Sequence, residues 1–348
     1  MRIYKDHLIL SGSKIKEALV QLNELSQDAI LFVVDSNDKL IGALTDGDVR
    51  RGLLKGFTIK SLVDEIIQKD PRYIRKGENN LQKIIEYRMG DFRILPVVDE
   101  NHKIINIINF RNTKSYLPID AVIMAGGRGQ RLKPLTDTIP KPLLKVGDKA
   151  IMEHNLDRLA LFGIDDFWIS VKYLGEQIEK YFGLGEDKNI KIQYVKEDIP
   201  LGTIGAISKI KNFEHNYILI TNSDLLTNID YEQFFLEFIN QEADFAVLTI
   251  PYQVNIPYAV LETSNGQVKS FKEKPTYTYY SNGGIYLMKK EMLQFIPSDT
   301  FFNATDLMEE LIKNNFKVVS YPFVGYWLDV GKHEDFEKAQ KDIKNIAL

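Results

Sequence analysis

Glycines and cations cluster directly after Ile119–Met124, an apolar run typical of a buried strand. The cluster comprises Ala125, Gly126, Gly127, Gly129, Arg131 and Lys141. Glycines let the backbone approach a triphosphate and turn its N–H groups toward the oxygens, and the two cations could stabilise a departing pyrophosphate. The spacing differs from that of the dinucleotide loop and of the Walker A loop. The cluster therefore predicts a phosphate site of another kind.

Two aspartates follow apolar runs in distant parts of the chain. Asp224 comes shortly after Tyr217–Thr221, and Asp329 follows Phe323–Tyr326. Carboxylate oxygens are the hard ligands that Mg²⁺ prefers, and two acids can clamp one ion against a phosphate. An aspartate after a strand can also be a turn residue or a helix cap. These two acids alone therefore leave both interpretations open.

The glycine cluster continues into a longer motif. Residues 131–136 read Arg-Leu-Lys-Pro-Leu-Thr, and Lys141-Pro142 follows. Together they resemble the N-terminal motif of sugar nucleotidyltransferases, which join a sugar 1-phosphate to a nucleotide and release pyrophosphate. The resemblance, which covers the chain from about residue 120 onward, implies that Arg131, Lys141 and Asp224 are catalytic. It also implies that the glycine cluster binds the nucleotide and that Asp224 and Asp329 bind Mg²⁺.

Two later segments resemble the sugar side of the same family. They are Phe271–Pro275, with the sequence Phe-Lys-Glu-Lys-Pro, and Ser281–Tyr286, with the sequence Ser-Asn-Gly-Gly-Ile-Tyr. The family places the glutamate on sugar hydroxyls, the lysine on the sugar phosphate, and the Asn-x-Gly strand start in the sugar pocket. The resemblance thus assigns sugar binding to Glu273, Lys274, Asn282 and Gly283, and gives Lys274 a catalytic role as well. Ala259 replaces a glycine of many relatives, so hexose, hexosamine such as glucosamine, and heptose 1-phosphates all remain open.

The identity of the base depends on Glu197 and Gly202. The resemblance places Glu197 at the base-reading position, and Gly202 would let the base lie flat on the backbone. A carboxylate only accepts hydrogen bonds, and guanine alone offers two adjacent donors. Glu197 therefore favours GTP, with a uridylyl- or thymidylyltransferase as the alternative. A solvent-exposed Glu197 would carry no such information.

Apolar runs alternate with helical patterns after residue 118, which predicts an α/β fold: a doubly wound, mostly parallel, Rossmann-like sheet. Ligands bind such sheets at the carboxyl ends of the strands. The predicted strands are Phe167–Val171, Lys191–Val195, Tyr217–Thr221 and Phe245–Ile250. The predicted helices are Gly175–Tyr181, Thr203–Ile210 and Tyr231–Asn240.

The first third of the chain contains an internal repeat. Val33–Ile41 is similar to Val97–Ile105, at an offset of 64 residues. The pattern resembles a tandem pair of α+β CBS domains, which often bind adenine nucleotides. In the first copy Thr45 and Asp48 match the family's nucleotide-binding positions, so AMP or ATP is an expected ligand. The second copy has asparagines at the matching positions, and a pair that serves only packing or oligomerisation is the alternative.

Composition limits the remaining possibilities. The net charge is −4, no basic run occurs, and no stretch of about 18 apolar residues is present, so we expect neither nucleic-acid nor membrane partners. The absence of cysteine fits a cytoplasmic protein. We expect CBS domains at 1–58 and 59–116, a nucleotidyltransferase domain at 119–348, and a homo-oligomer. The competing functional class is a non-catalytic sensor of sugar or adenine nucleotides.

Overall fold

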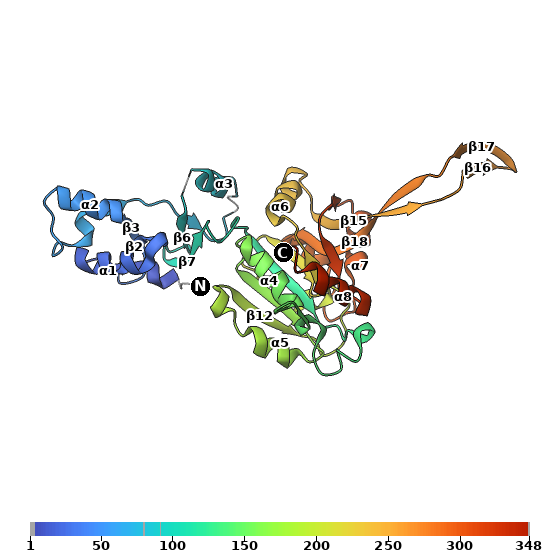
Figure 1. The fold of residues 1–348 in the computed structure, drawn as a ribbon, viewed down its shortest axis with the longest axis horizontal. Coiled ribbons are helices and arrows are strands. Elements are labelled where there is room, and N and C mark those ends of the chain that lie inside the picture. The colour runs from blue at the N-terminus through green and yellow to red at the C-terminus, as the bar shows by residue number, and fades with distance from the viewer. Residues whose placement is uncertain (1–3, 79–80, 91, 347–348) are drawn as a thin grey trace. The chain divides into compact units, whose positions relative to one another are not determined.

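The computed structural model describes residues 4–78, 81–90 and 92–346 (Figure 1). Residues 1–3, at the start of the predicted domain 1–58, and residues 347–348, at the end of the predicted domain 119–348, lie outside the described residues. The chain divides into two compact units. Unit 1 contains residues 1–118, 160–165 and 184–191. Unit 2 contains residues 119–159, 166–183 and 192–348.

Unit 1 repeats one small β motif. Its helices are α1 (Ile15–Leu25), α2 (Asp46–Leu54) and α3 (Leu81–Met89). Its strands are β1 (Leu8–Leu10), β2 (Ile30–Val34), β3 (Leu40–Thr45), β4 (Gln68–Lys69), β5 (Ile74–Arg75), β6 (Ile94–Val98) and β7 (Ile104–Asn109). The strands form one sheet in the order β1-β2-β3-β4 and another in the order β5-β6-β7. In each copy, therefore, an antiparallel strand pair packs beside a helix.

The 64-residue offset of the repeat is also visible in the backbone. The β2–β3 pairing shifts register between Val33 and Val34, and the β6–β7 pairing shifts at the two valines 64 positions later. The copies meet at an antiparallel bridge between Lys39 and Lys103, which are themselves 64 residues apart. A bridge between equivalent residues is what a pseudo-twofold axis produces. The predicted repeat is confirmed.

The two copies differ in the segment after the second strand of the pair. In the first copy Thr45 and Asp48 form a capping box that starts α2, with the Thr45 N–H donating to Asp48 over 2.9 Å. In the second copy Asn109 accepts from the N–H of Arg111, and the chain turns instead of forming a helix. The loss of the capping pair removes the signal that starts the helix. The chain then leads into unit 2.

Unit 2 is built around a seven-stranded sheet. The helices of the remaining chain are α4 (Ile151–Leu161), α5 (Gly175–Phe182), α6 (Tyr231–Asn240), α7 (Ala304–Lys313) and α8 (His333–Asp342). The strands of the sheet are β8 (Ile119–Ala125), β11 (Asp166–Val171), β12 (Lys191–Lys196), β13 (Tyr217–Asn222), β15 (Phe245–Asn255), β18 (Thr276–Lys289) and β19 (Val318–Pro322). Smaller two-stranded pairs are β9 (Lys145–Val146) with β10 (Lys149–Ala150), β14 (Leu225–Thr227) with β20 (Trp327–Asp329), and β16 (Val260–Ser264) with β17 (Gln267–Lys272).

The order of the large sheet is β12-β11-β8-β13-β18-β15-β19. The pairs β11–β8, β8–β13 and β15–β19 are parallel, and β18 is antiparallel to both of its neighbours. The predicted α/β fold with a mostly parallel sheet is confirmed. Because chain order reverses on either side of β8, the carboxyl end of this strand is a topological switch point, where ligands bind in such sheets.

One predicted helix is wrong. Thr203–Ile210 forms only the short 3-10 helix Gly205–Lys209. The backbone N–H groups of Ile204 and Gly205 both donate to the carbonyl of Phe302, at 3.1 Å each, so tertiary bonds take the place of a first helical turn. Among the helices of the described chain, none is long and apolar enough to cross a bilayer.

Candidate active site

The glycine cluster forms a loop at the carboxyl end of β8. Gly129 has φ +61°, a left-handed conformation that favours glycine. A Cβ atom there would lie 3.0 Å from the Cβ of Lys141 and 3.0 Å from Thr136. The Thr136 hydroxyl donates to the Gly129 carbonyl over 2.9 Å. The loop therefore closes around the buried Lys141, which begins the 3-10 turn Lys141–Leu143.

Lys141 lies between the two predicted metal ligands. Its ammonium forms an ion pair with Asp224 and lies 3.8 Å from a carboxylate oxygen of Asp329. Asp329 ends β20, which pairs with β14 so that Asp329 lies opposite Leu225, the residue after Asp224. The N–H of Val330 also donates to the carbonyl of Asp224 over 3.0 Å. This small sheet holds together two acids that are 105 positions apart in the chain.

The electrostatics of this cluster favour a bound cation. Burial and the neighbouring charge of Asp224 raise the pKa of Asp329, while Lys141 and Arg131 act in the opposite direction. Two close carboxylates repel each other unless positive charge lies between them. The Arg131 guanidinium is near the same acids. It lies beside Gly331, two residues after Asp329, where a Cβ atom would be 3.1 Å from it. The structure thus gathers Arg131, Lys141, Asp224 and Asp329.

Glu197 lies beside the glycine loop, one residue after β12. A Cβ atom on Gly126 would lie 2.7 Å from its carboxylate. That carboxylate accepts hydrogen bonds from the Ser170 hydroxyl and, at 3.2 Å, from the N–H of Leu201. Glu197 is therefore fixed toward the loop rather than turned to solvent, and each oxygen keeps a lone pair for a further donor.

Gly202 is required by the backbone around it. Its φ is +78°, and a Cβ atom would lie 2.6 Å from the carbonyl oxygen of Phe302. The glycine lets the 201–205 segment pack against residues 300–303. This packing role is seen in the structure, whereas the role of Gly202 in stacking the base stays a prediction.

The comparisons with known proteins agree with this geometry. Residues 120–346 match the family model described as nucleotidyl transferase. The chain belongs to the nucleotidyl transferase family. Residues 8–55 and 63–117 each match the CBS domain model. The chain thus joins two CBS domains to a sugar-1-phosphate nucleotidyltransferase, which is an enzyme of the nucleotide-transferring class.

Relatives of the transferase part differ in substrate. D-glycero-α-D-manno-heptose 1-phosphate guanylyltransferase of Aneurinibacillus thermoaerophilus is 32% identical over 234 residues, which cover 65% of this chain and 99% of that protein. UTP–glucose-1-phosphate uridylyltransferase of Synechocystis sp. is 29% identical over 254 residues, covering 66% of this chain and 65% of that protein. The crystal structure of HddC from Yersinia pseudotuberculosis with GMP-PN aligns at TM-score 0.50 and 25% identity, covering 64% of this chain and 99% of that one.

The acids of the transferase fit a divalent metal. One carboxylate oxygen each of Asp224 and Asp329 is buried without a hydrogen-bond donor among the described residues. Hard carboxylate oxygens at the edge of a phosphate loop are suited to Mg²⁺. Lys141 now provides the positive charge between them, as a metal ion would.

The sugar-side residues of the transferase fall into two groups. Asn282 and Gly283 lie where β18 leaves the large sheet, and the indole N–H of Trp327 donates to the Gly283 carbonyl over 2.9 Å. Because Trp327 and Asp329 share β20, this part is close to the acids. Glu273 and Lys274 are exposed instead, beyond the end of the β15–β18 ladder.

The distance to this second group follows from strand geometry. From Asn282 the ladder runs back to Thr276, the first residue of β18. These six residues span roughly 20 Å of extended chain. Lys274 lies beyond that point, two residues before β18 begins. The two groups of predicted sugar-side residues therefore lie apart along β18, and their roles in sugar binding stay predictions.

Two side chains at the transferase site were missed in the sequence. Ser170, which donates to Glu197, is the penultimate residue of β11 and lies in register with Met124 of β8. Trp327, which was not among the predicted site residues, joins β20 to the sugar-side strand through its indole N–H. Strand order, once known, brings Ser170 to the switch point, but the sequence alone does not give that order.

The predicted adenine-nucleotide residues lie in unit 1. The buried carboxylate of Asp48 accepts from the Thr45 hydroxyl at 2.6 Å, from Gln68 at 2.7 Å and from Arg51. These hydrogen bonds lower the pKa of Asp48 against the effect of burial. Asp48 is therefore a helix cap in this structure, and ribose binding by it stays a prediction.

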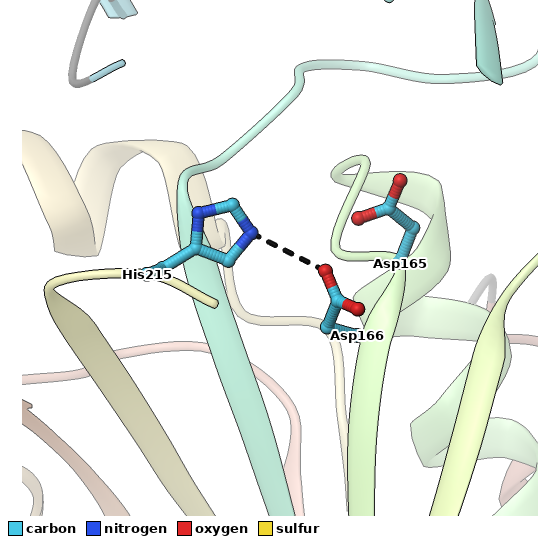
Figure 2. A group of neighbouring side chains, drawn as sticks. All are labelled: Asp165, Asp166 and His215. Carbon is cyan, nitrogen blue, oxygen red and sulfur yellow. Dashed lines mark ion pairs between the residues drawn. The ribbon is translucent and has the colours of Figure 1, made fainter. Parts of the chain in front are cut away.

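A buried charged cluster lies at the opposite, amino edge of the large sheet. Asp120 of β8 and Asp166 of β11 are register partners, and His215 faces Asp166 at 3.4 Å (Figure 2). Asp120 accepts from the backbone N–H of His215 over 2.8 Å, yet burial raises its pKa to about 6. The catalytic edge and this edge are separated by the length of the strands. This cluster therefore affects stability rather than substrate binding.

Proposed function

We propose that the protein is a Mg²⁺-dependent sugar-1-phosphate guanylyltransferase that converts GTP and a sugar 1-phosphate to GDP-sugar and pyrophosphate. The observation that supports it most is the position of Glu197 against Gly126, with its carboxylate held by Ser170 and Leu201. A fixed acceptor beside the phosphate loop suits the paired N–H donors of guanine. The guanylyltransferase relative and the GMP-PN complex of HddC add support.

The residues act in defined places. The backbone N–H groups of the glycine loop and Arg131 bind the β- and γ-phosphates and stabilise the pyrophosphate as it leaves. Asp224 and Asp329 would hold Mg²⁺, which supplies positive charge at the α-phosphate. Lys141 would then be free to turn from the acids to the phosphates. The sugar phosphate oxygen attacks the α-phosphate in line, so no covalent enzyme intermediate is needed.

The test is a pyrophosphate-release assay with full-length protein. GTP, UTP, dTTP and ATP are each paired with glucose, mannose, glucosamine and heptose 1-phosphates in the presence of Mg²⁺. We expect GTP to exceed every other nucleotide by at least about 10²-fold in kcat/KM, because a mismatched base leaves the Glu197 carboxylate facing acceptors. A preference for UTP or dTTP would support the alternative, and no release from any pair would support the sensor.

Glu197→Gln isolates the base contact. An amide both donates and accepts, so we expect the GTP preference to fall by about 10- to 100-fold while UTP or dTTP gains. Asp198→Asn is the matched control, since Asp198 is the next residue and its side chain is 91% exposed. An unchanged nucleotide preference in the Glu197 variant would contradict the guanine assignment.

The CBS pair is proposed to bind AMP or ATP in its first copy. A pocket in unit 1 is lined by residues of α1 and the following turn together with Asp46, which is adjacent to Thr45. Thr45→Ala removes a hydroxyl that donates to Asp48 in this structure and that would turn to a phosphate of the bound nucleotide. Calorimetry with AMP and ATP should show binding by the natural chain and at least about 10-fold weaker binding by this variant. If neither nucleotide gives a heat of binding, the alternative is supported, in which the CBS pair serves only packing or oligomerisation.

A further inference from the structure

Residues 251–281 form a long arm that extends from the large sheet (Figure 1). Strands β15 and β18 stay paired out to Asn255 and Thr276, and the hairpin β16–β17 continues the arm to its tip. The tip residues Asn265 and Gly266 have φ +50° and +77°. Positive φ at both positions fits a tight hairpin turn whose twist matches the strands. The arm is therefore regular structure.

The arm exposes large apolar side chains. Tyr258 is 75% exposed, Phe271 65%, Tyr252 62% and Val268 57%. A two-stranded ribbon is marginal in water by itself, and its unpaired edges and apolar side chains favour association. Its own unit does not cover this surface. The arm thus has the character of an interface element.

The exposed area matches what a stable dimer needs. Eight large apolar side chains of the arm are at least 36% exposed. A fully exposed aromatic side chain offers about 200 Å², and the five aromatic members are 57–75% exposed, so covering all eight side chains would bury on the order of 800 Å² of each arm. The surface that an arm covers loses a similar area, so one arm alone would bury about 1,600 Å² in total, the standard size of a specific interface, and two exchanged arms about twice that.

The residues carried by the arm indicate which partner it meets. Glu273 and Lys274 are exposed and, in the described part of the chain, form no ion pair, although the proposed function assigns them to the sugar phosphate. Lys274 has φ +42°, an uncommon conformation for a residue with a side chain. It lies between the two ladders of the arm, where the chain can bend. The two residues with a proposed ligand thus stand on the part of the arm that their own unit leaves exposed.

We propose that the arm of one chain covers the active site of a second copy and supplies Lys274 and Glu273 to the sugar phosphate bound there. This inference rests on the proposed function. The end of the ladder lies roughly 20 Å along β18 from Asn282, so an arm that stays straight carries Lys274 away from the sheet that holds its own acids. A second copy presents the same acids to an arm that stays straight.

The first test measures assembly alone. Analytical ultracentrifugation compares the natural chain with a Tyr258→Lys/Phe271→Lys double variant and with Ile312→Lys, a control on α7 that is 61% exposed. We expect the natural chain and the control to be dimers or larger, and the arm variant to dissociate at least about 10²-fold more readily, since charge replaces central apolar contacts. A monomeric natural chain, or an arm variant that assembles normally, would overturn the proposal.

The second test asks whether the arm acts on a neighbour. Asp224→Ala has an intact arm and a disabled site, and Lys274→Ala has the reverse. Each alone should be at least about 10-fold less active, whereas Lys269→Ala, a change at another exposed lysine of the arm, should be near normal. If arms act between chains, co-expressed equal amounts should recover about one quarter of the natural activity, because half of the chains offer a working site and half of those receive a working arm.

The outcomes separate the two hypotheses. No recovery in the mixture, with an active natural chain, would show that the arm folds back on its own site and would overturn the inference alone. Full activity of Lys274→Ala would also overturn it. A natural chain that releases no pyrophosphate from any substrate pair would refute the proposed function, and the ultracentrifugation would still decide whether the arm joins chains.

Discussion

The buried carboxyl of Asp120 should make unit 2 more stable as the pH falls from 7.5 to 5. Asp120 is fully buried at the amino edge of the sheet, where it accepts from the N–H groups of Glu214 and His215 and lies beside Asp166. Burial raises its pKa from 3.8 to about 6. The folded state thus binds the proton more tightly than the unfolded state, and protonation stabilises the fold.

The magnitude follows from linkage. Above pH 7 the carboxyl is charged in both states, and its burial costs about 3 kcal/mol of stability. This cost is relieved as the pH falls through 6. Between pH 7.5 and pH 5 the single group adds about 1.4 kcal/mol to the free energy of unfolding. Asp120→Asn removes the titration while keeping the shape of the side chain.

The assay is urea unfolding at both pH values, followed by tryptophan fluorescence. Both tryptophans of the chain, Trp168 and Trp327, lie in unit 2, so the signal reports on this unit in the full-length protein. Asn offers one acceptor where Asp120 offers two, so the substitution adds a pH-independent loss of about 1–3 kcal/mol, which at pH 7.5 is offset by removal of the buried charge. The quantity to compare is therefore the change in the free energy of unfolding between pH 7.5 and pH 5, measured for each protein.

The natural chain should gain about 1.4 kcal/mol more than Asp120→Asn on going from pH 7.5 to pH 5. The neighbouring Asp166 and His215 are present in both proteins, so the comparison isolates Asp120. Equal gains in the two proteins would refute the reasoning. A larger gain in the variant would show that Asp120 is charged and stabilising in the fold.

Three further outcomes are expected. Asp224→Ala should lower kcat by about 10³-fold with an unchanged unfolding curve, since it removes charge stabilisation at the α-phosphate, and normal turnover would contradict the site. Gly202→Ala should destabilise unit 2 by more than about 1 kcal/mol, because of φ +78° and the carbonyl of Phe302 at 2.6 Å, as measured by the same fluorescence. Asp48→Ala should destabilise unit 1 by about 1–2 kcal/mol through loss of the cap with Thr45, measured by hydrogen exchange of α2, and unchanged protection would contradict the capping role.

Much of the fold was accessible from the sequence because local signals agreed with the tertiary structure. The apolar run before Gly126 forms a buried parallel strand, and predicted helix 231–240 begins at Asp230, which caps it by accepting from Gln233 over 2.9 Å. The repeat was detectable because both copies keep the same strand pair. The absence of a full helix at 203–210 could not be predicted. There the carbonyl of Phe302, about 100 positions away in the chain, accepts hydrogen bonds from the N–H groups of Ile204 and Gly205.

The site was predicted in part. The order of motifs identified Lys141, Asp224 and Asp329, which the β14–β20 pairing brings together. The arm could not be predicted, because nothing local to Phe245–Ile250 shows that pairing continues to Asn255. Ser170 could not be predicted either, since its role depends on which strands are neighbours.

The separation of Glu197 from the paired acids has a consequence for nucleotide choice. Glu197 stands on the loop after β12 and is held by β11, whereas Asp224 and Asp329 are held by the β14–β20 pair on the other side of β8. In the proposed enzyme, a substitution at Glu197 can therefore change nucleotide choice while the backbone pairing that holds Asp224 and Asp329 stays as it is.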